Sequence, residues 1–592
     1  MSTDSISTQR RLEELDNILD SALKQFDPDL EPFEILICQL DSYREDQVSR
    51  AESLFSLARN CRLDSLSLAL SRLLSSPLPD LRAQAALLLG EHFTTAFFER
   101  LKRTTLDTLK SALLSAFRNK LFKLDVDNLF QTISDFHATG SWPELLPFLF
   151  ECVNSQSPNL QEYALLVFKR LAQNLDSHAD LIFHLNTFQQ IFRECLDNCS
   201  SWDVKIAALD ASISFVQFIP NQNDPNRFDY LLRLMMRTLT NALNSGSESK
   251  SEESLQLLIK LAKTDPRFFE RQLEKVLQLM LNITVDDSLE VDIKHSAIEF
   301  LMALVESDPR MISKEPQFIK RLFDELMYML FDVEYVDEDE YEVDNFWGTS
   351  DYILAKKCLS KLSILLDEKM IFQRVLRLFS HLLGTSIWQQ RHATLIAIPK
   401  IALGSNKMMP KNMEEVVPMI LESVNDPHPW VQLAAINAIK QLSVCLCPMF
   451  QNLYHEIVLV TLVEVMNEDL RPKLQVSATS AVLSFMRYGD EKIQVFYKRT
   501  IWHEFSKFIR AGHIIGHPEL RILSCGLVDE FFKCLEDKFL QCSEDKFLQC
   551  SEDLAKLRNS ISNNQIENYI NDLKSLLRWF DVKCNKSKNK LE

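Results

Sequence analysis

Hydrophobic positions recur along the chain in blocks with helical spacing. Each block begins with a polar turn that often holds Pro or Asp, then an aliphatic residue, a polar or basic pair, and small residues among further aliphatics. Because Pro and Asp favour helix starts, the pattern predicts helices that begin at these turns. The clearest copies lie at 75–90, 155–172, 200–215, 385–402, 424–443 and 468–485, with weaker copies at 290–304 and 516–532.

The small residues give the period of the array. Ala164 and Ala207 are 43 positions apart, Ala393 and Ala434 are 41 apart, and Ala434 and Ala478 are 44 apart. Helix pairs that repeat every 40 to 47 residues or so are typical of HEAT and armadillo arrays. We therefore predict an all-α fold, an α-α superhelix (a HEAT/armadillo-like solenoid) of roughly a dozen helix pairs.

Composition narrows the classes of function. Only ten glycines occur in 592 residues, which argues against folds that bind nucleotides through glycine-rich loops. The formal charge of −18 disfavours nucleic acid and anionic membranes as partners, and favours basic protein segments. The first residues lack the apolar core of a signal peptide, and no run of about twenty apolar residues predicts a membrane span.

No motif for catalysis is present. The sequence has no phosphate-binding loop, metalloprotease, serine-hydrolase or EF-hand signature, and its thirteen cysteines include no CxxC pair. His392 and His428 lie at predicted helix starts, where capping or packing is favoured over metal binding. We expect a protein that is not an enzyme and has no cofactor and no metal site.

One acidic segment interrupts the period. Between Leu322 and Ala355 there are eleven Asp and Glu residues and no Lys or Arg, and self-repulsion of the carboxylates favours an extended loop. The segment is either a solvated surface insertion or a loop that binds basic peptide or protein, since its aromatic rings can stack on Arg or on Lys stems. The aromatic residues are Tyr335, Tyr341, Phe346 and Trp347. The candidate binding residues are Asp337, Glu338, Asp339, Glu340, Glu342, Asp344 and Trp347.

Several motifs follow one another in the order of a known family. They are "REDQVSRAESLF" (44–55), "PDLRAQAALLL" (79–89), "GSWPELLPFLFECVNSQSPNLQEYALLVFKRL" (140–171), "RHA" (391–393) and "DPHPWVQLAAINAIKQ" (426–441). Together they resemble the karyopherin-β, or importin-β, family of nuclear import receptors, most closely the N-terminal half of its importin-5 (karyopherin β3) branch. The acidic segment falls where that branch has an acidic loop.

The resemblance implies a transport receptor. In that family the N-terminal repeats bind Ran-GTP, and the second-helix face of the middle repeats binds basic nuclear localisation signals. Seams between outer helices bind phenylalanine-glycine nucleoporins. Ran ejects the cargo in the nucleus by differential binding. The resemblance therefore implies a monomer that shuttles between cytoplasm and nucleus through the nuclear pore, without direct nucleic-acid binding or membrane insertion.

Site residues can be carried over by position in the family pattern. The predicted cargo-binding residues of the inner face are Trp388, Arg391, Asn437 and Gln441, and those of the Ran-binding region are Arg50, Glu52 and Arg82. The pattern also departs from the family, because Leu403 and Cys445 stand where acidic residues are expected. Several polar anchors for a Lys-rich peptide are thus missing.

The expected organisation follows the chain. It consists of an N-terminal helical lead-in (1–40), importin N-terminal-like repeats with the Ran-binding region (41–120), HEAT repeats (121–330), the acidic loop insertion (331–350), cargo-facing HEAT repeats (351–535), and a segment with the duplicated "EDKFLQCS" and a C-terminal helix and tail (536–592). The chain is roughly half as long as full receptors of the family, so we expect the C-terminal arch to be missing. The alternative function is a truncated HEAT-repeat scaffold or adaptor that no longer cycles as a transport receptor.

Overall fold

The protein is described here by a computed structural model whose regular elements are helices throughout the described ranges. These ranges are 2–24, 29–40, 42–92, 100–118, 142–173, 183–218, 229–333, 349–405, 407–466 and 472–489, together with the single residues 97, 130 and 493 and the pair 133–134. The chain divides into two units, one comprising residues 1–276 and 287–303 and the other comprising 277–286 and 304–592.

The first unit contains α1 (Ser2–Leu23), α2 (Glu31–Leu40), α3 (Glu45–Cys61), α4 (Leu63–Leu73), α5 (Pro79–His92), α7 (Arg103–Arg118), α9 (Leu145–Val153), α10 (Pro158–Gln173), α12 (Leu185–Asn198), α13 (Trp202–Phe218), α14 (Asp229–Asn244), α15 (Glu248–Thr264) and the 3-10 helix η2 (Pro266–Gln272). Helices α16 (Leu273–Thr284) and α17 (Val291–Ser307) have residues in both units. The second unit contains α18 (Pro309–Ile312), α19 (Pro316–Met329), α20 (Ser350–Leu365), α21 (Glu368–Leu383), α22 (Trp388–Ala402), α23 (Met408–Lys411), α24 (Met413–Ser423), α25 (Pro429–Cys445), α26 (Met449–Met466) and α27 (Pro472–Arg487).

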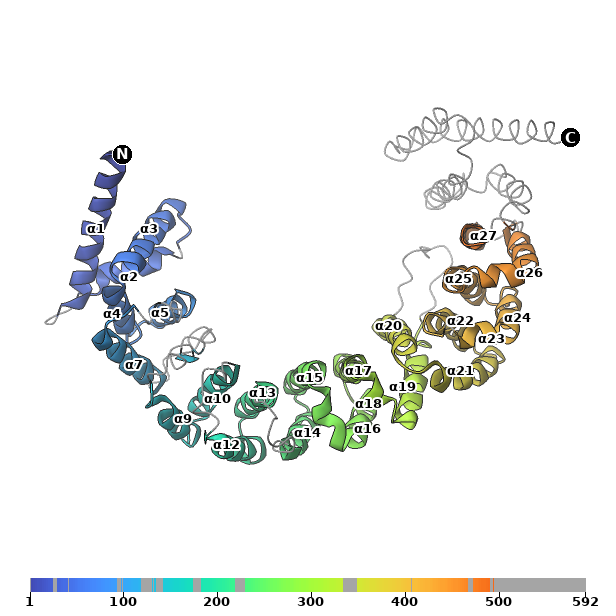
Figure 1. Cartoon of the computed structure of the whole chain (residues 1–592), viewed down its shortest axis with the longest axis horizontal. Coiled ribbons are helices and arrows are strands. Elements are labelled where there is room, and N and C mark those ends of the chain that lie inside the picture. The colour runs from blue at the N-terminus through green and yellow to red at the C-terminus, as the bar shows by residue number, and fades with distance from the viewer. Residues whose placement is uncertain are drawn as a thin grey trace. The chain divides into compact units, whose positions relative to one another are not determined.

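Both units are built from helix pairs that stack in two layers. In the first unit α10, α13 and α15 pack on one another in succession, and α12 packs on α14 in the other layer. In the second unit α20, α22, α25 and α27 form one row, which we call the inner row (Figure 1). Helices α21 and α24 pack behind it, and α26 packs on α25 and α27. The predicted all-α solenoid is confirmed.

The sequence signals of the repeat explain why the helices begin and pack as they do. Proline opens α5, α10, α25 and α27, at the turns where the pattern predicts helix starts. A small residue is buried at the corresponding position of seven of the helices, which permits close approach of neighbouring backbones. These residues are Ala85, Ala164, Ala207, Ala297, Ala393, Ala434 and Ala478.

Predicted segment boundaries meet the structure at two places. The lead-in helix α1 packs on α2, α3 and α4, so it contributes to the core of the first repeats. Of the acidic segment 331–350, residues 334–348 lie outside the described residues, as do the duplicated segment and the tail. The predicted domain boundaries stay predictions.

Candidate functional site

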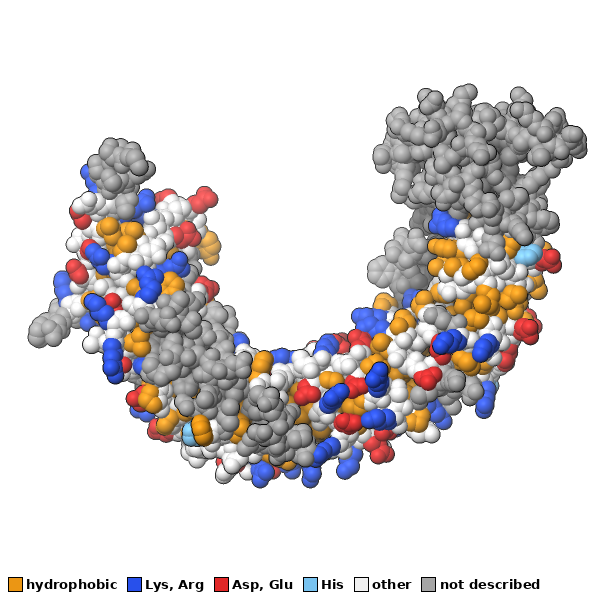
Figure 2. All heavy atoms as spheres, viewed as in Figure 1, with side chains coloured by type: hydrophobic (Ala, Val, Ile, Leu, Met, Phe, Trp, Pro, Cys, Tyr) orange, Lys and Arg blue, Asp and Glu red, His pale blue; other side chains and the backbone are white. Residues whose placement is uncertain are grey.

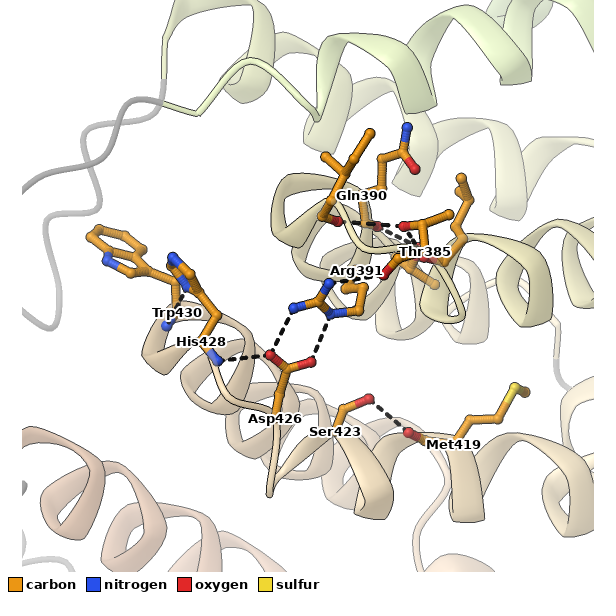
Figure 3. A network of polar contacts seen from close by, with 11 residues as sticks. Thr385, Gln390, Arg391, Met419, Ser423, Asp426, His428 and Trp430 are labelled. Atoms are coloured by element: carbon orange, nitrogen blue, oxygen red, sulfur yellow. Dashed lines mark hydrogen bonds and ion pairs between the residues drawn. The ribbon is translucent and has the colours of Figure 1, made fainter.

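A buried ion pair joins two successive repeats of the inner row. The Arg391 guanidinium donates to both carboxylate oxygens of Asp426, with Nε–Oδ2 2.7 Å and Nη2–Oδ1 2.9 Å, and donates from Nη1 to the Thr385 carbonyl at 2.9 Å (Figure 3). The two side chains are only 12% and 9% exposed. Such bidentate geometry fixes orientation as well as charge. Arg391 therefore orders the turn before α22 and the turn before α25.

Asp426 also prepares the start of α25. Its Oδ1 accepts from the backbone N–H of His428 at 2.8 Å, and His428 Nδ1 accepts from the N–H of Trp430 at 3.3 Å (Figure 3). His428 is thus the N-cap of α25, and its ring stacks on Trp388 with centroids 4.1 Å apart and planes 6° apart. The predicted capping role of His428 is confirmed, and Trp388 is engaged in this stack.

His392 lies at the centre of an aromatic cluster. Its ring is 6.1 Å from that of Tyr352, 6.2 Å from Trp388 and 6.4 Å from Trp430, centroid to centroid. Burial, together with the nearby charges of His428 and Lys356, lowers the pKa of His392 to about 3. The imidazole is neutral at physiological pH, and the predicted packing role is confirmed.

The remaining two predicted inner-face residues lie on α25. Asn437 and Gln441 are both half-buried, and the side-chain carbonyl of Gln441 accepts from Lys400 Nζ of α22 at 3.0 Å. Gln441 therefore already holds a lysine of this chain. A peptide lysine that sought Gln441 would have to displace or share that contact.

Two half-buried lysines dominate the charge of this face. Lys356 of α20 lies over the Tyr352 ring, with Nζ 5.0 Å from the centroid. Burial lowers the pKa of Lys356, and repulsion by Lys400 lowers it further. Burial also lowers the pKa of Lys400, against a raising effect of Cys445. Among the described residues, no carboxylate forms an ion pair with either ammonium group.

The C-terminal ends of the helices in this row expose apolar side chains. Ile364 is 61% exposed, Leu403 43% and Val444 45%, and they occupy the ends of α20, α22 and α25, respectively. The first two ends touch, because the hydroxyl of Ser363 donates to the Lys400 carbonyl at 2.9 Å. A Cβ on Gly404 would lie 1.8 Å from the Ser363 carbonyl oxygen. We call Lys356, Lys400, Ile364, Leu403 and Val444 the basic-apolar face.

The predicted Ran-binding residues lie in the first unit. Arg50 of α3 forms an ion pair with Glu14 of α1. Arg82 of α5 donates to the carbonyl oxygens of Ser76 and Pro77 at 2.8 and 3.0 Å, whereas Glu52 is exposed on α3. Of the three, Glu52 is the side chain most available to a partner.

The acidic segment is anchored at both ends. The Thr349 hydroxyl donates to the Asp332 carbonyl at 3.1 Å, and accepts from the Tyr352 N–H as the N-cap of α20. The predicted loop residues lie outside the described residues. They are Asp337, Glu338, Asp339, Glu340, Glu342, Asp344 and Trp347.

A second surface feature lies in the layer behind the inner row. Leu453, Ile457 and Val460 of α26 are each more than half exposed, and their spacing places them on one helix face. Hydrophobic side chains gather over this helix in Figure 2. Sequence reasoning missed this stripe because α26 is apolar on almost every side.

Two absences concern the described part of the chain alone. No described helix is both long and apolar enough to cross a membrane. The described residues also hold no cluster of three or more His, Cys, Asp or Glu side chains that could bind a metal ion.

Three family models match the chain: "IPO5-like, TPR repeats" over residues 116–279, "Importin repeat" over 286–373 and "HEAT repeat" over 416–446. Importin subunit beta-3 of Saccharomyces cerevisiae is 23% identical over 404 residues, which cover 66% of this chain and 36% of that protein. The chain thus matches about a third of this curated relative's length.

Solved structures of Kap121p show the same fold. Kap121p bound to Pho4p has a TM-score of 0.76 at 19% identity, covering 89% of this chain and 51% of that chain. Kap121p bound to RanGTP has a TM-score of 0.71 at 18% identity, covering 94% and 56%, respectively.

Proposed function

Because the chain belongs to the importin-β family, in its importin-5 branch, we propose that it is a nuclear transport receptor that binds Ran-GTP and cargo. The observation that carries this proposal is the ordered match to importin repeats, on a helix array similar to that of RanGTP-bound Kap121p. The protein would shuttle between cytoplasm and nucleus. Its role would be binding and release, without bond chemistry.

Ran binding is proposed for the first repeats. The test is capture of the full chain by immobilised Ran locked in the GTP state, with Ran-GDP as the control. We expect capture by the GTP form alone, and we expect Glu52→Lys to weaken it, since this side chain is exposed on α3. Glu274→Lys, on an exposed position of α16, is the matched control. Equal capture by both nucleotide states would contradict the proposal.

Basic localisation signals are proposed to bind chiefly through the acidic segment. Arg391 is paired with Asp426, and Gln441 holds Lys400, so the inner face has little capacity left for a lysine-rich peptide. Replacing Asp337, Glu338, Asp339, Glu340 and Glu342 by Asn or Gln should weaken binding of a Lys-rich signal peptide and flatten its dependence on salt. Unchanged affinity and salt dependence would reduce the segment to a solvated insertion.

Phenylalanine-glycine nucleoporins are proposed to bind the α26 stripe. Their phenylalanines need apolar surface, and Leu453, Ile457 and Val460 provide it on a single exposed helix face. Leu453→Ser with Ile457→Ser should abolish binding of a phenylalanine-glycine repeat peptide. Val291→Ser, at an exposed apolar residue of α17, should leave binding unchanged.

The second candidate function is a scaffold or adaptor that no longer cycles. The basic-apolar face favours it, because Lys400 and Leu403 occupy the inner face on which family members bind basic cargo. Under this alternative, capture of the chain by Ran would be absent or would not depend on the nucleotide.

A further inference from the structure

The inner row of the second unit is basic, although the whole chain is acidic. Helices α20, α22, α25 and α27 together contain eight Lys and Arg residues and one acidic residue, Asp351. Some of the eight are paired with carboxylates: Arg391 pairs with Asp426, and Lys361 pairs with Glu306. The charge of this row is therefore opposite in sign to the net charge of −18 of the whole chain.

Lys356 and Lys400 are two lysines of this row that are half-buried without a carboxylate partner among the described residues. Each is half-buried, so burial lowers the pKa of both, and the charge of Lys400 lowers the pKa of Lys356 as well. Desolvated cations are stabilised by carboxylates, and none of the described residues supplies one to either lysine. Gln441 offers only a neutral acceptor to Lys400. The pair is therefore electrostatically unsatisfied within the described fold.

Apolar side chains are exposed at the C-terminal ends of the helices that carry the lysines. Lys400 lies one turn before Leu403 on α22, and Lys356 lies about two turns before Ile364 on α20. Ile364, Leu403 and Val444 are exposed at successive helix ends of the same row, and Gly404 brings the end of α22 against the backbone of α20. A ligand bound at the end of α22 would meet the Lys400 ammonium group and the Leu403 side chain within one turn of helix.

We propose that the basic-apolar face binds an extended acidic segment of a partner protein, in which carboxylates alternate with large apolar side chains. Carboxylates would pair with Lys356 and Lys400, and the apolar side chains would cover Ile364, Leu403 and Val444. A protein partner is favoured over nucleic acid because exposed aliphatic side chains make no favourable contact with a phosphate backbone. The net charge of −18 also repels a long polyanion. This inference goes beyond the transport function and holds equally for a scaffold.

The test is fluorescence anisotropy of the full chain with a labelled synthetic peptide of alternating Glu and Phe residues. We expect the wild type to bind this peptide, with an affinity that falls as salt is added. The double variant Lys356→Gln with Lys400→Gln should bind it at least about tenfold more weakly. A matching peptide of alternating Lys and Phe residues should not bind to the wild type. Glutamine at position 400 can still hydrogen-bond Gln441. The matched control is Lys320→Gln combined with Lys411→Gln, on α19 and α23, which should bind as the wild type does.

Further arms separate the alternatives. Leu403→Ser combined with Val444→Ser should also weaken the peptide, whereas a Glu and Ser peptide should bind poorly to the wild type. Neutralising Asp337, Glu338, Asp339, Glu340 and Glu342 should leave peptide affinity equal or higher, because it removes a competing acidic segment. The proposal is overturned if the Glu and Phe peptide fails to bind both the wild type and this neutralised variant. It is also overturned if the double lysine variant binds normally, or if a single-stranded oligonucleotide binds with the same dependence on the two lysines. Capture by Ran-GTP, measured on the same double lysine variant, should be unchanged, so failure here is distinguishable from failure of the transport proposal.

Discussion

Removing Arg391 should loosen one interface between repeats far more than removing a comparable exposed arginine. Arg391→Ala deletes two hydrogen bonds to Asp426 and one to the Thr385 carbonyl, and leaves a carboxylate that is 9% exposed with only the His428 N–H. Breaking a buried pair by removing one partner costs about 3–5 kcal/mol. Since both groups lie at the edge of a repeat, we expect about 3 kcal/mol.

The chain offers a matched control. Arg237 pairs with Asp197 across two other successive repeats, but these side chains are 50% and 39% exposed. An exposed pair contributes less than about 1 kcal/mol, so Arg237→Ala should have a small effect. The different burial of two otherwise similar Arg–Asp pairs isolates the contribution of desolvation.

The measurement is amide hydrogen exchange, because long repeat arrays open locally and a single unfolding free energy is poorly defined for them. In Arg391→Ala the opening free energies of α22 and α25 should fall by about 3 kcal/mol, while α12 and α14 remain unchanged. Arg391→Met combined with Asp426→Leu should recover most of the loss, because no charge is left buried. If α22 and α25 respond no more than α12 and α14 do in Arg237→Ala, the ion pair does not stabilise this interface.

Three further changes test other parts of the second unit. Gly404→Ala should strongly destabilise α20 and α22, because the new Cβ would lie 1.8 Å from a backbone oxygen. Gly384→Ala should be tolerated, because the atoms nearest to its Cβ are 3.5 Å away. Amide hydrogen exchange on α20 compares the two variants. In the wild type, the stability of α22 should fall as the pH drops below about 6.5. The reason is that His392, with a pKa of about 3 in the folded protein, stays neutral when folded but becomes protonated when unfolded. The slope should reach at most about 1.4 kcal/mol per pH unit, the value for one proton. His392→Phe should remove that slope, and an equal slope in the variant would assign it to other groups. Lys400→Met should raise the stability of α22 at neutral pH, because burial lowers the pKa of Lys400 and so opposes its charged form. The denaturant dependence of amide hydrogen exchange on α22 measures this change. A loss of stability would show that the hydrogen bond to Gln441 contributes more than the burial of the charge costs.

The sequence predicts the array well because its signals are local. Proline at the start of α10 or α25 and a buried alanine such as Ala164 act within one helix or at its nearest neighbour. Their periodic recurrence is enough to predict stacked helix pairs. The packing role of His392 follows in the same way from its place at a predicted helix start.

The candidate site is harder to predict because its contacts join different repeats. Arg391 and Asp426 are 35 positions apart, and nothing in either helix alone shows that the arginine is already paired. Lys356 and Lys400 look like solvated charges in the sequence, and their burial arises only when three helices stack. The apolar helix ends are likewise contiguous only in the folded row.

The hydrogen bond between Thr349 and the Asp332 carbonyl has a consequence for variation in this protein. It joins the residues at which the acidic segment leaves and rejoins the helix array, with 3.1 Å between the Thr349 hydroxyl oxygen and the Asp332 carbonyl oxygen. A chain that departs and returns at one place can change length without altering the stacking of α19 on α20. Doubling such a loop costs only about 0.6 kcal/mol in closure entropy. The segment can therefore change its length and its number of carboxylates nearly independently of the rest of the protein. The repeats that support it stay in register.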